Sequence, residues 1–297
     1  MRKNLFCLLF CVLSLVSMAS VSDSSVIFKA SFLKNELQSY SISRSVYTML
    51  KTDTTSLERI RFKADVYVQD STENYYLLTW RFSNFAINTG NNQLKELIAL
   101  AKPVKINYRI TKPGILADFL NGENVSTCLE DALPKVLEQF ADKKGNEVRT
   151  AVASIYDMRE TMETLMLRSI TQFHQAYGLG YTLEEVVDVP TEMNSRFSTK
   201  PIKGIIRKKL TKIDTENNLA FLSTATFLDK TEFQKSFKEY LKLDSVAETS
   251  IDQENMGGII MDLTTGWVLW TFDQRETKVQ NQVYGELLEI KHIDDIP

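Results

Sequence analysis

Apolar and polar residues alternate along residues 59–69 of this 297-residue chain. The apolar positions are Ile60, Phe62, Ala64, Val66 and Val68. Because successive side chains of a strand point to opposite faces, this pattern predicts a half-buried strand. The next residues, DSTEN at 70–74, have the composition of a turn. Alternation then resumes, with apolar positions at Tyr76, Leu78, Trp80 and Phe82. Together the two segments predict a β-hairpin.

A short helix and a second hairpin follow in the pattern. Within residues 91–103 the apolar positions have helical spacing, Asn91 or Asn92 can cap the helix, and Pro103 stops it. Residues 104–111 alternate again as a strand. Lys112-Pro113-Gly114 then supplies a turn into residues 115–120. The first half of the chain is therefore predicted to run strand, turn, strand, helix, strand, turn, strand.

The second half repeats this order. Residues 205–213 and 219–227 are predicted strands around a second TEN tripeptide at 215–217. A capping box at Thr231 to Gln234 is expected to open a helix. Residues 259–264 and 267–272 then form a hairpin around Thr265-Gly266. The shared order predicts that the fold is built from two copies of one unit.

An α-rich insert separates the two copies. One amphipathic stripe begins at Leu129, with Pro134 in the first turn of its helix or at a kink, and a longer helix is predicted over residues 146–174. We therefore expect an α+β fold of two related antiparallel half-sheets around a helical insert, possibly a half-open barrel. Pro190 marks an edge strand or a break. The expected segments are a signal peptide at 1–19, a first β-rich repeat at 20–122, the insert at 123–180 and a second repeat at 181–297.

The N-terminus has the three-part pattern of a secretory signal peptide. Arg2 and Lys3 precede an apolar run over residues 5–16, and Ser17-Met18-Ala19 fits the cleavage rule. The run is shorter than the ~20 apolar residues of a spanning helix. We therefore expect export to the periplasm or cell surface as a soluble chain without a transmembrane helix. A lipoprotein is the less favoured alternative, because Cys7 and Cys11 lie inside the run.

The hairpins with short glycine turns, ITKPGILADF and LTTGWVLWTF, together with the paired half-sheets, resemble uncharacterised exported proteins of Bacteroidetes-type bacteria. More distantly, the plan is similar to the half-open barrels of periplasmic lipoprotein carriers. That resemblance implies a curved antiparallel sheet that wraps helices and holds acyl chains on an apolar concave face. Asp53-Thr54-Thr55, Asp70-Ser71-Thr72 and Asp244-Ser245-Val246 also look like the O-glycosylation acceptors of such bacteria.

Catalytic and cofactor motifs are missing from the sequence. The chain has two histidines, His174 and His292, and no P-loop, GxGxxG, HExxH, GxSxG or CxxC pattern. His174, at the end of a predicted helix, can meet the C-terminal helix dipole. The formal net charge of −3 gives no indication of nucleic-acid binding. We expect no enzyme activity, no cofactor and no metal site.

Two sets of residues are candidates for ligand binding. The aromatic set could line a concavity between sheet and helices, or fill the core: Trp80, Phe82, Trp270 and Phe272. The basic set could orient an anionic head group, or form a solvated strand face: Arg207, Lys208 and Lys209. The leading hypothesis is an exported, non-catalytic protein that binds an apolar or amphiphilic, lipid-like ligand. The alternative is an envelope protein whose surface binds a protein partner or a glycan.

Overall fold

One long antiparallel sheet forms most of the molecule. The computed structural model describes residues 24–293, except 52, 143, 194–199, 242–250 and 280. The expected signal peptide and the Asp244-Ser245-Val246 acceptor lie outside the described residues. In spatial order the eleven strands are β6 (Leu116–Phe119), β5 (Val104–Thr111), β4 (Tyr75–Asn88), β3 (Asp53–Ser71), β2 (Leu37–Leu50), β13 (Gln282–His292), β12 (Val268–Val279), β11 (Ile251–Asp262), β10 (Leu219–Leu228), β9 (Ile202–Asp214) and β8 (Val186–Met193). β1 (Ser25–Ile27) and β7 (Gly180–Thr182) form a separate two-stranded sheet.

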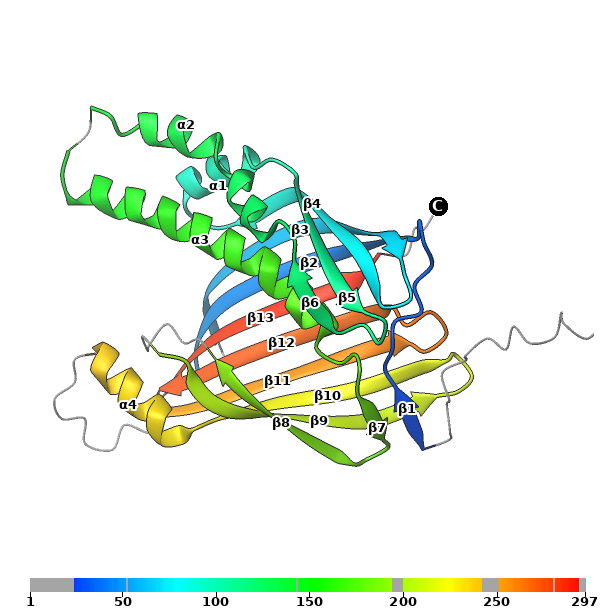
Figure 1. Cartoon of the computed structure of the whole chain (residues 1–297). Coiled ribbons are helices and arrows are strands. Elements are labelled where there is room, and N and C mark those ends of the chain that lie inside the picture. The colour runs from blue at the N-terminus through cyan, green and yellow to red at the C-terminus, as the bar shows by residue number, and fades with distance from the viewer. Residues whose placement is uncertain are drawn as a thin grey trace, which may run out of the picture.

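The sheet is continuous and open, which corrects the expectation of two half-sheets. β2 pairs with β13 from Leu50 opposite Gln282 to Tyr40 opposite His292, and this pairing joins the two halves. β6 and β8 are the edges, so the sheet does not close on itself. Pro190 lies in β8, and its predicted place on an edge strand is confirmed. The secondary structure is mostly β, and the sheet curves strongly (Figure 1).

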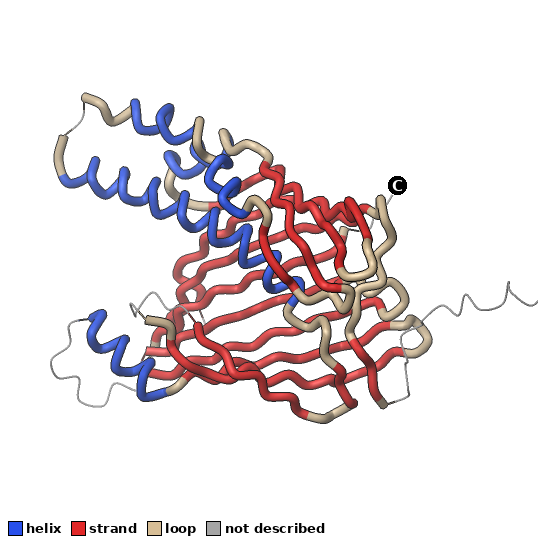
Figure 2. The backbone as a smooth tube through the Cα atoms, in the orientation of Figure 1, coloured by secondary structure: helices blue, strands red, loops and turns tan. Residues whose placement is uncertain are grey.

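Most of the described helices lie together on one side of the sheet, and the last one lies apart from them (Figures 1 and 2). They are α1 (Asn92–Ala99), the 3-10 helix η1 (Gly122–Cys128), α2 (Ala132–Glu138), α3 (Asn146–His174) and α4 (Lys230–Leu241). Asn91 caps α1 by accepting from the amide of Leu94, as the sequence predicts. α4 begins one residue before the predicted capping box, and Asp229 accepts from the amide of Glu232.

The helix α3 has the bounds that the sequence predicts, and its C-terminal half packs on the sheet. α3 also packs on α1 and η1. We call the sheet face that contacts α3 the inner face; Phe173 of α3 meets Tyr40 and Trp80 there, with ring centroids 5.3 and 5.4 Å apart. The large buried side chains of the inner face and of α3 form one core.

Each half contains the predicted order of elements. β3, β4, α1, β5 and β6 run strand, strand, helix, strand, strand, and β9, β10, α4, β11 and β12 do the same. The quartets β6-β5-β4-β3 and β12-β11-β10-β9 also occur in the same spatial order in the sheet. The origin of the two halves by duplication stays a prediction.

Candidate binding site

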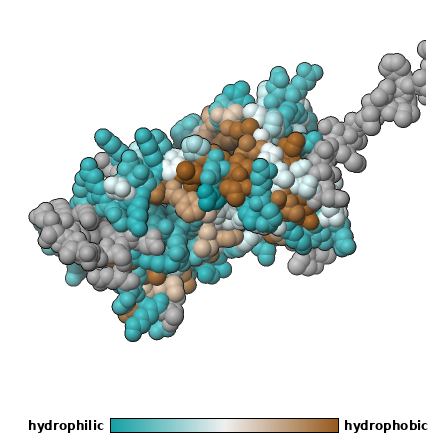
Figure 3. Space-filling model, turned by 90° about the horizontal axis from the view of Figure 1, so that it is seen from below, coloured by the Kyte–Doolittle hydropathy of each residue, from teal (hydrophilic) through white to brown (hydrophobic). Residues whose placement is uncertain are grey.

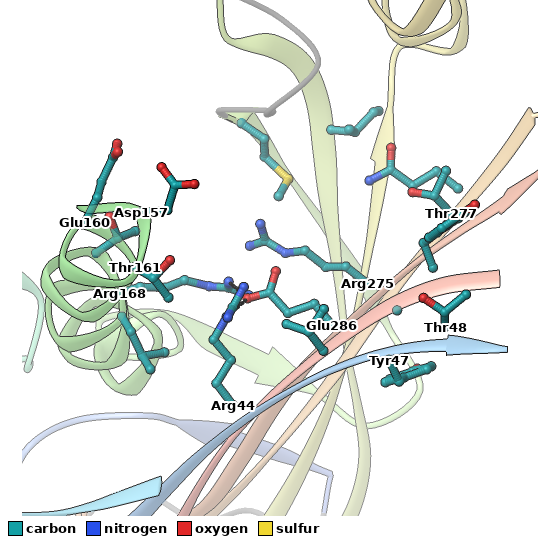
Figure 4. A pocket seen from close by; sticks show the side chains of 18 of the residues that line it. Arg44, Tyr47, Thr48, Asp157, Glu160, Thr161, Arg168, Arg275, Thr277 and Glu286 are labelled. Atoms are coloured by element: carbon teal, nitrogen blue, oxygen red, sulfur yellow. Dashed lines mark hydrogen bonds and ion pairs between the residues drawn. The ribbon is translucent and has the colours of Figure 1, made fainter. Parts of the chain in front are cut away.

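A cavity of about 740 Å³ lies between the middle of α3, from Asp157 to Arg168, and the inner face of the sheet (Figure 4). The sheet contributes its floor from β2, β13, β12 and β11. The lining residues there include Arg44, Val46, Thr48, Tyr284, Glu286, Arg275, Thr277 and Gln253. α3 forms one wall of the cavity. Three apolar residues from other elements also line the cavity: Met193 of β8, Leu228 of β10 and Phe233 of α4. The cavity therefore combines a charged floor with apolar side chains.

Strand alternation brings the charged floor residues together. Glu286 of β13 stands opposite Val46 of β2 on one side and opposite Arg275 of β12 on the other. Arg44 precedes Val46 by two positions and so shares its face. Segments about 240 residues apart in the chain therefore place Arg44 and Glu286 within hydrogen-bond distance, 2.8 Å between Nε and Oε1.

Arg168 links α3 to this floor. Its Nη1 donates to Glu286 Oε1 at 2.7 Å, and its Nη2 donates to Asp273 Oδ2 at 2.7 Å. Arg275 donates to the same Asp273 oxygen from Nε at 3.0 Å and pairs with it from Nη2 at 2.9 Å. The result is one network of five charged side chains: Arg44, Glu286, Arg168, Asp273 and Arg275.

Burial and neighbouring charges shift the pKa values in this network. Burial by itself raises the pKa of Glu286, but the Arg168 and Arg44 guanidinium groups outweigh it and lower that pKa to about 2. The pKa of Arg275 is lowered, first by burial and then by repulsion from Arg168. For Arg168, attraction to Glu286 and Asp273 outweighs burial and raises the pKa. Glu286 is therefore ionised and Arg168 protonated at neutral pH.

The α3 wall carries acidic and hydroxyl groups. Asp157, Glu160, Thr161 and Thr164 line the cavity at the spacing of one helix face. Asp157 and Glu160 are exposed at the mouth, opposite Arg275 (Figure 4). The wall continues into the core through Leu165, which is buried.

Trp80 and Phe82 lie on the inner face but belong to the filled core. Both are fully buried, and Phe173 of α3 covers Trp80. Trp80 Nε1 donates to the Tyr108 hydroxyl at 2.8 Å. These aromatic residues therefore occupy the apolar part of the concavity themselves, and neither lines the cavity.

Trp270 and Phe272 lie on the opposite, outer face. Trp270 donates to Glu289 at 2.8 Å, and Glu289 lies between the inner-face residues Leu288 and Ile290 in β13. The Trp270 and Phe272 rings are 4.7 Å apart. The structure thus separates the four aromatic candidates into two pairs on two faces, and they share no concavity.

The basic candidates are separated in the same way. Arg207 pairs with Asp188 at 2.9 Å and Lys209 pairs with Glu184 at 2.5 Å, both on the outer face. Lys208 points inward and donates to the carbonyl of Gln175, the C-cap of α3, at 2.5 Å. Burial lowers the pKa of Lys208. The three residues do not form one head-group site, and none lines the cavity.

His174 is buried in a hydrogen-bonded chain. Its Nδ1 lies 2.9 Å from the Gly114 carbonyl and its Nε2 lies 2.9 Å from the Tyr108 hydroxyl. Burial lowers its pKa to about 3, so the imidazole is neutral and donates to the carbonyl. This corrects the expected charged contact with the helix dipole. In the described part of the chain, no three His, Cys, Asp or Glu residues lie close enough together to hold a metal ion.

The sequence interpretation did not single out the network residues. The signal was present in β12, where Thr271, Asp273, Arg275 and Thr277 put polar groups on the face that is apolar in the neighbouring parts of the sheet. A charged run on an inner face indicates either a paired network or a ligand site. No family model matches this chain, and no curated protein is similar to it in sequence. None of the described helices is long and apolar enough to cross a membrane.

Proposed function

We propose that this protein is an exported, non-catalytic binding protein that holds an amphiphilic ligand in the cavity between α3 and the inner face of the sheet. The observation that carries the proposal is the cavity itself. Its volume of about 740 Å³ is within the range of roughly 300–1,000 Å³ of small-molecule sites. The lining suits an amphiphile, because both apolar and charged side chains contribute to it.

The apolar part of the ligand would lie against Val46, Leu165, Met193, Leu228 and Phe233. Removing apolar ligand surface from water contributes about 25 cal/mol per Å². A filled core under the C-terminal half of α3 limits how deep the ligand can reach, because Trp80 and Phe173 already pack there. The ligand would therefore lie beside the middle of the helix, between Asp157 and Arg168.

The positions of the two histidines favour a binding protein over an enzyme. His174 is buried in the core, and His292 lies 2.7 Å from the Gln38 side chain on β2. Neither lines the cavity. The carboxylate of Glu286 is engaged by two guanidinium groups and has a pKa of about 2, which makes it a poor general base at neutral pH.

We also infer that the two halves arose by duplication and that the sheet is a half-open barrel of the kind seen in the lipoprotein carriers. The tandem spatial order of the quartets β6-β5-β4-β3 and β12-β11-β10-β9 supports the first inference. The strong curvature of the open sheet supports the second (Figure 1). Export rests on the signal-peptide pattern at residues 1–19. Cell fractionation tests it: a chain that keeps its first residues and stays in the cytoplasm contradicts export.

Native mass spectrometry with organic extraction tests the ligand. The protein is purified after export from bacterial cells. We expect the spectrum to show a bound species with the mass of a lipid. Val46→Trp fills the cavity from its floor and should remove the bound mass. Met256→Trp adds the same ring to the exposed outer face and is the matched control. An apo mass that persists after incubation with total envelope lipid contradicts the proposal.

A second candidate function is supported by an apolar patch on the outer face. Ile205, Phe227 and Met256 are 42, 52 and 47% exposed on the adjacent strands β9, β10 and β11. Figure 3 shows hydrophobic residues gathered among hydrophilic ones on the face seen from below. Exposed apolar patches on monomers often mark interaction sites. This patch favours an envelope protein or glycan as a partner.

Photo-crosslinking in cells tests the second candidate. A photoreactive residue in place of Met256 should yield a discrete crosslinked product. The same residue in place of Lys95, which is exposed on α1, should not. Equal products from both positions, or none from Met256, would count against a partner at the outer face.

A further inference from the structure

We propose that the charged floor of the cavity, formed by Arg44, Arg168 and Arg275, is a subsite for the phosphate or carboxylate head group of the amphiphile. The inference rests on the proposed function and adds the chemical class of the ligand. The head group meets the floor, and the alkyl chain packs against apolar lining residues such as Met193, Leu228 and Phe233.

The network has more donors than acceptors. Three guanidinium groups share two carboxylates, Glu286 and Asp273, which leaves one excess positive charge. Each guanidinium carries five N–H donors. The contacts with the carboxylates converge on a single oxygen of each, Glu286 Oε1 and Asp273 Oδ2. An anion with two or three oxygens supplies the acceptors and the charge that the network lacks.

The surroundings of Arg168 and Arg275 indicate where that anion would bind. Arg168 Nε is buried and has no hydrogen-bond partner among the described residues. Arg275 contacts Asp273 through Nε and Nη2, and its guanidinium group extends into the space between β12 and α3 (Figure 4). Burial and the neighbouring Arg168 cation lower the pKa of Arg275, and attraction to a bound anion would oppose this shift. Planar guanidinium groups bind phosphate and carboxylate through paired hydrogen bonds.

The acidic wall limits the charge of the ligand. Asp157 and Glu160 line the mouth opposite the floor, so a second negative group on the ligand would meet like charges there. A ligand with a single anionic group at one end of its alkyl chain fits both the arginine floor and the acidic α3 wall. Inorganic phosphate fits the floor but leaves the apolar residues without contact.

The experiment compares four probes by calorimetry, each below its micelle-forming concentration. They are dodecyl phosphate and laurate as anions, dodecyl maltoside as a neutral amphiphile, and inorganic phosphate without a chain. We expect both anionic amphiphiles to bind more tightly than the maltoside. Arg275→Gln should weaken the two anions by about 10- to 100-fold, because it removes hydrogen bonds to a charged group. It should weaken the maltoside less than the two anions, and circular dichroism checks that the variant is folded.

Arg207→Gln is the matched control, because Arg207 is paired with a carboxylate in the same way but on the outer face. It should change none of the affinities. Equal binding of anionic and neutral amphiphiles, or anion binding that Arg275→Gln does not weaken, overturns the subsite and leaves the proposed function intact. Binding of inorganic phosphate as tight as that of dodecyl phosphate overturns the head-group assignment in favour of a small anion. If no amphiphile binds, the proposed function fails together with the subsite.

Discussion

The hydroxyl group of Tyr108 lies 2.9 Å from Nε2 of His174, and this contact ties the end of α3 to the first half of the sheet. Trp80 donates to the same hydroxyl, and His174 Nδ1 donates to the Gly114 carbonyl. The chain of three hydrogen bonds runs from β4 through β5 to α3 and the glycine turn. It satisfies these polar groups inside an aromatic core, which is where an unpaired polar group costs most.

Protonation of His174 should destabilise the protein in mild acid. Burial lowers its folded-state pKa from 6.5 to about 3. The unfolded chain therefore takes up a proton below about pH 6.5 that the folded chain refuses, so the free energy of unfolding falls as the pH falls from 6.5 toward 3. Glu286 acts in the same direction only below about pH 4.5, because its folded-state pKa is about 2.

Urea unfolding at pH 7, 6 and 5 isolates the histidine contribution. His174→Gln removes the titrating group, so its stability should be lower at pH 7 but should change less between pH 7 and 5 than that of the unaltered protein. An equally steep pH dependence in both proteins would contradict a buried neutral imidazole.

Glu286→Gln should destabilise the protein strongly. The substitution leaves the guanidinium groups of Arg44 and Arg168 without their shared carboxylate. Breaking a buried ion pair from one side costs roughly 3–5 kcal/mol. Asp188→Asn removes an exposed partner of Arg207 and should change the stability little, because water screens such a pair. Chemical unfolding at pH 7 compares the two, and similar small losses would mean that the network adds little to stability.

Gly266→Ala should destabilise the hairpin between β11 and β12. Gly266 has φ +73°, and a Cβ at that position would clash with the Lys29 carbonyl oxygen. The backbone contact cannot relax cheaply, so we expect a loss of more than about 1 kcal/mol. Gly90→Ala is the control, because a Cβ at that position meets nothing within 4 Å. Thermal unfolding measures both, and equal melting temperatures would contradict the close approach of the turn to the N-terminal segment.

Trp80→Ala and Trp270→Ala should have very different effects. Trp80 is fully buried under Phe173, so its truncation should cost about 3–5 kcal/mol. Trp270 is partly exposed on the outer face, and its loss should cost clearly less. Urea unfolding followed by circular dichroism gives both values. A larger loss for Trp270→Ala would contradict the assignment of the two residues to opposite faces.

The sequence by itself determined the local elements. Period-two alternation predicts the strands around residues 59–69, 75–85 and 104–111, and helical spacing predicts α3 with the bounds that it has. These patterns depend on neighbouring residues alone, which is why they can be recognised without a fold. β2 was harder to predict, because Ser39, Ser41, Ser43 and Ser45 form its outer face and leave few apolar positions.

Only the tertiary structure decided which residues meet. The pairing of β2 with β13 joins the two ends of the chain into one sheet and assembles Arg44 with Glu286, and no local pattern encodes a partner about 240 residues away. The faces of β12 depend on a bulge opposite Ile260 and Met261, which puts Val268 and Thr271 on the buried face and turns Trp270 outward. A one-residue shift exchanges the two faces of a strand, so the local pattern of β12 does not reveal that Trp270 and Phe272 lie on the outer face while Trp80 and Phe82 lie on the inner one.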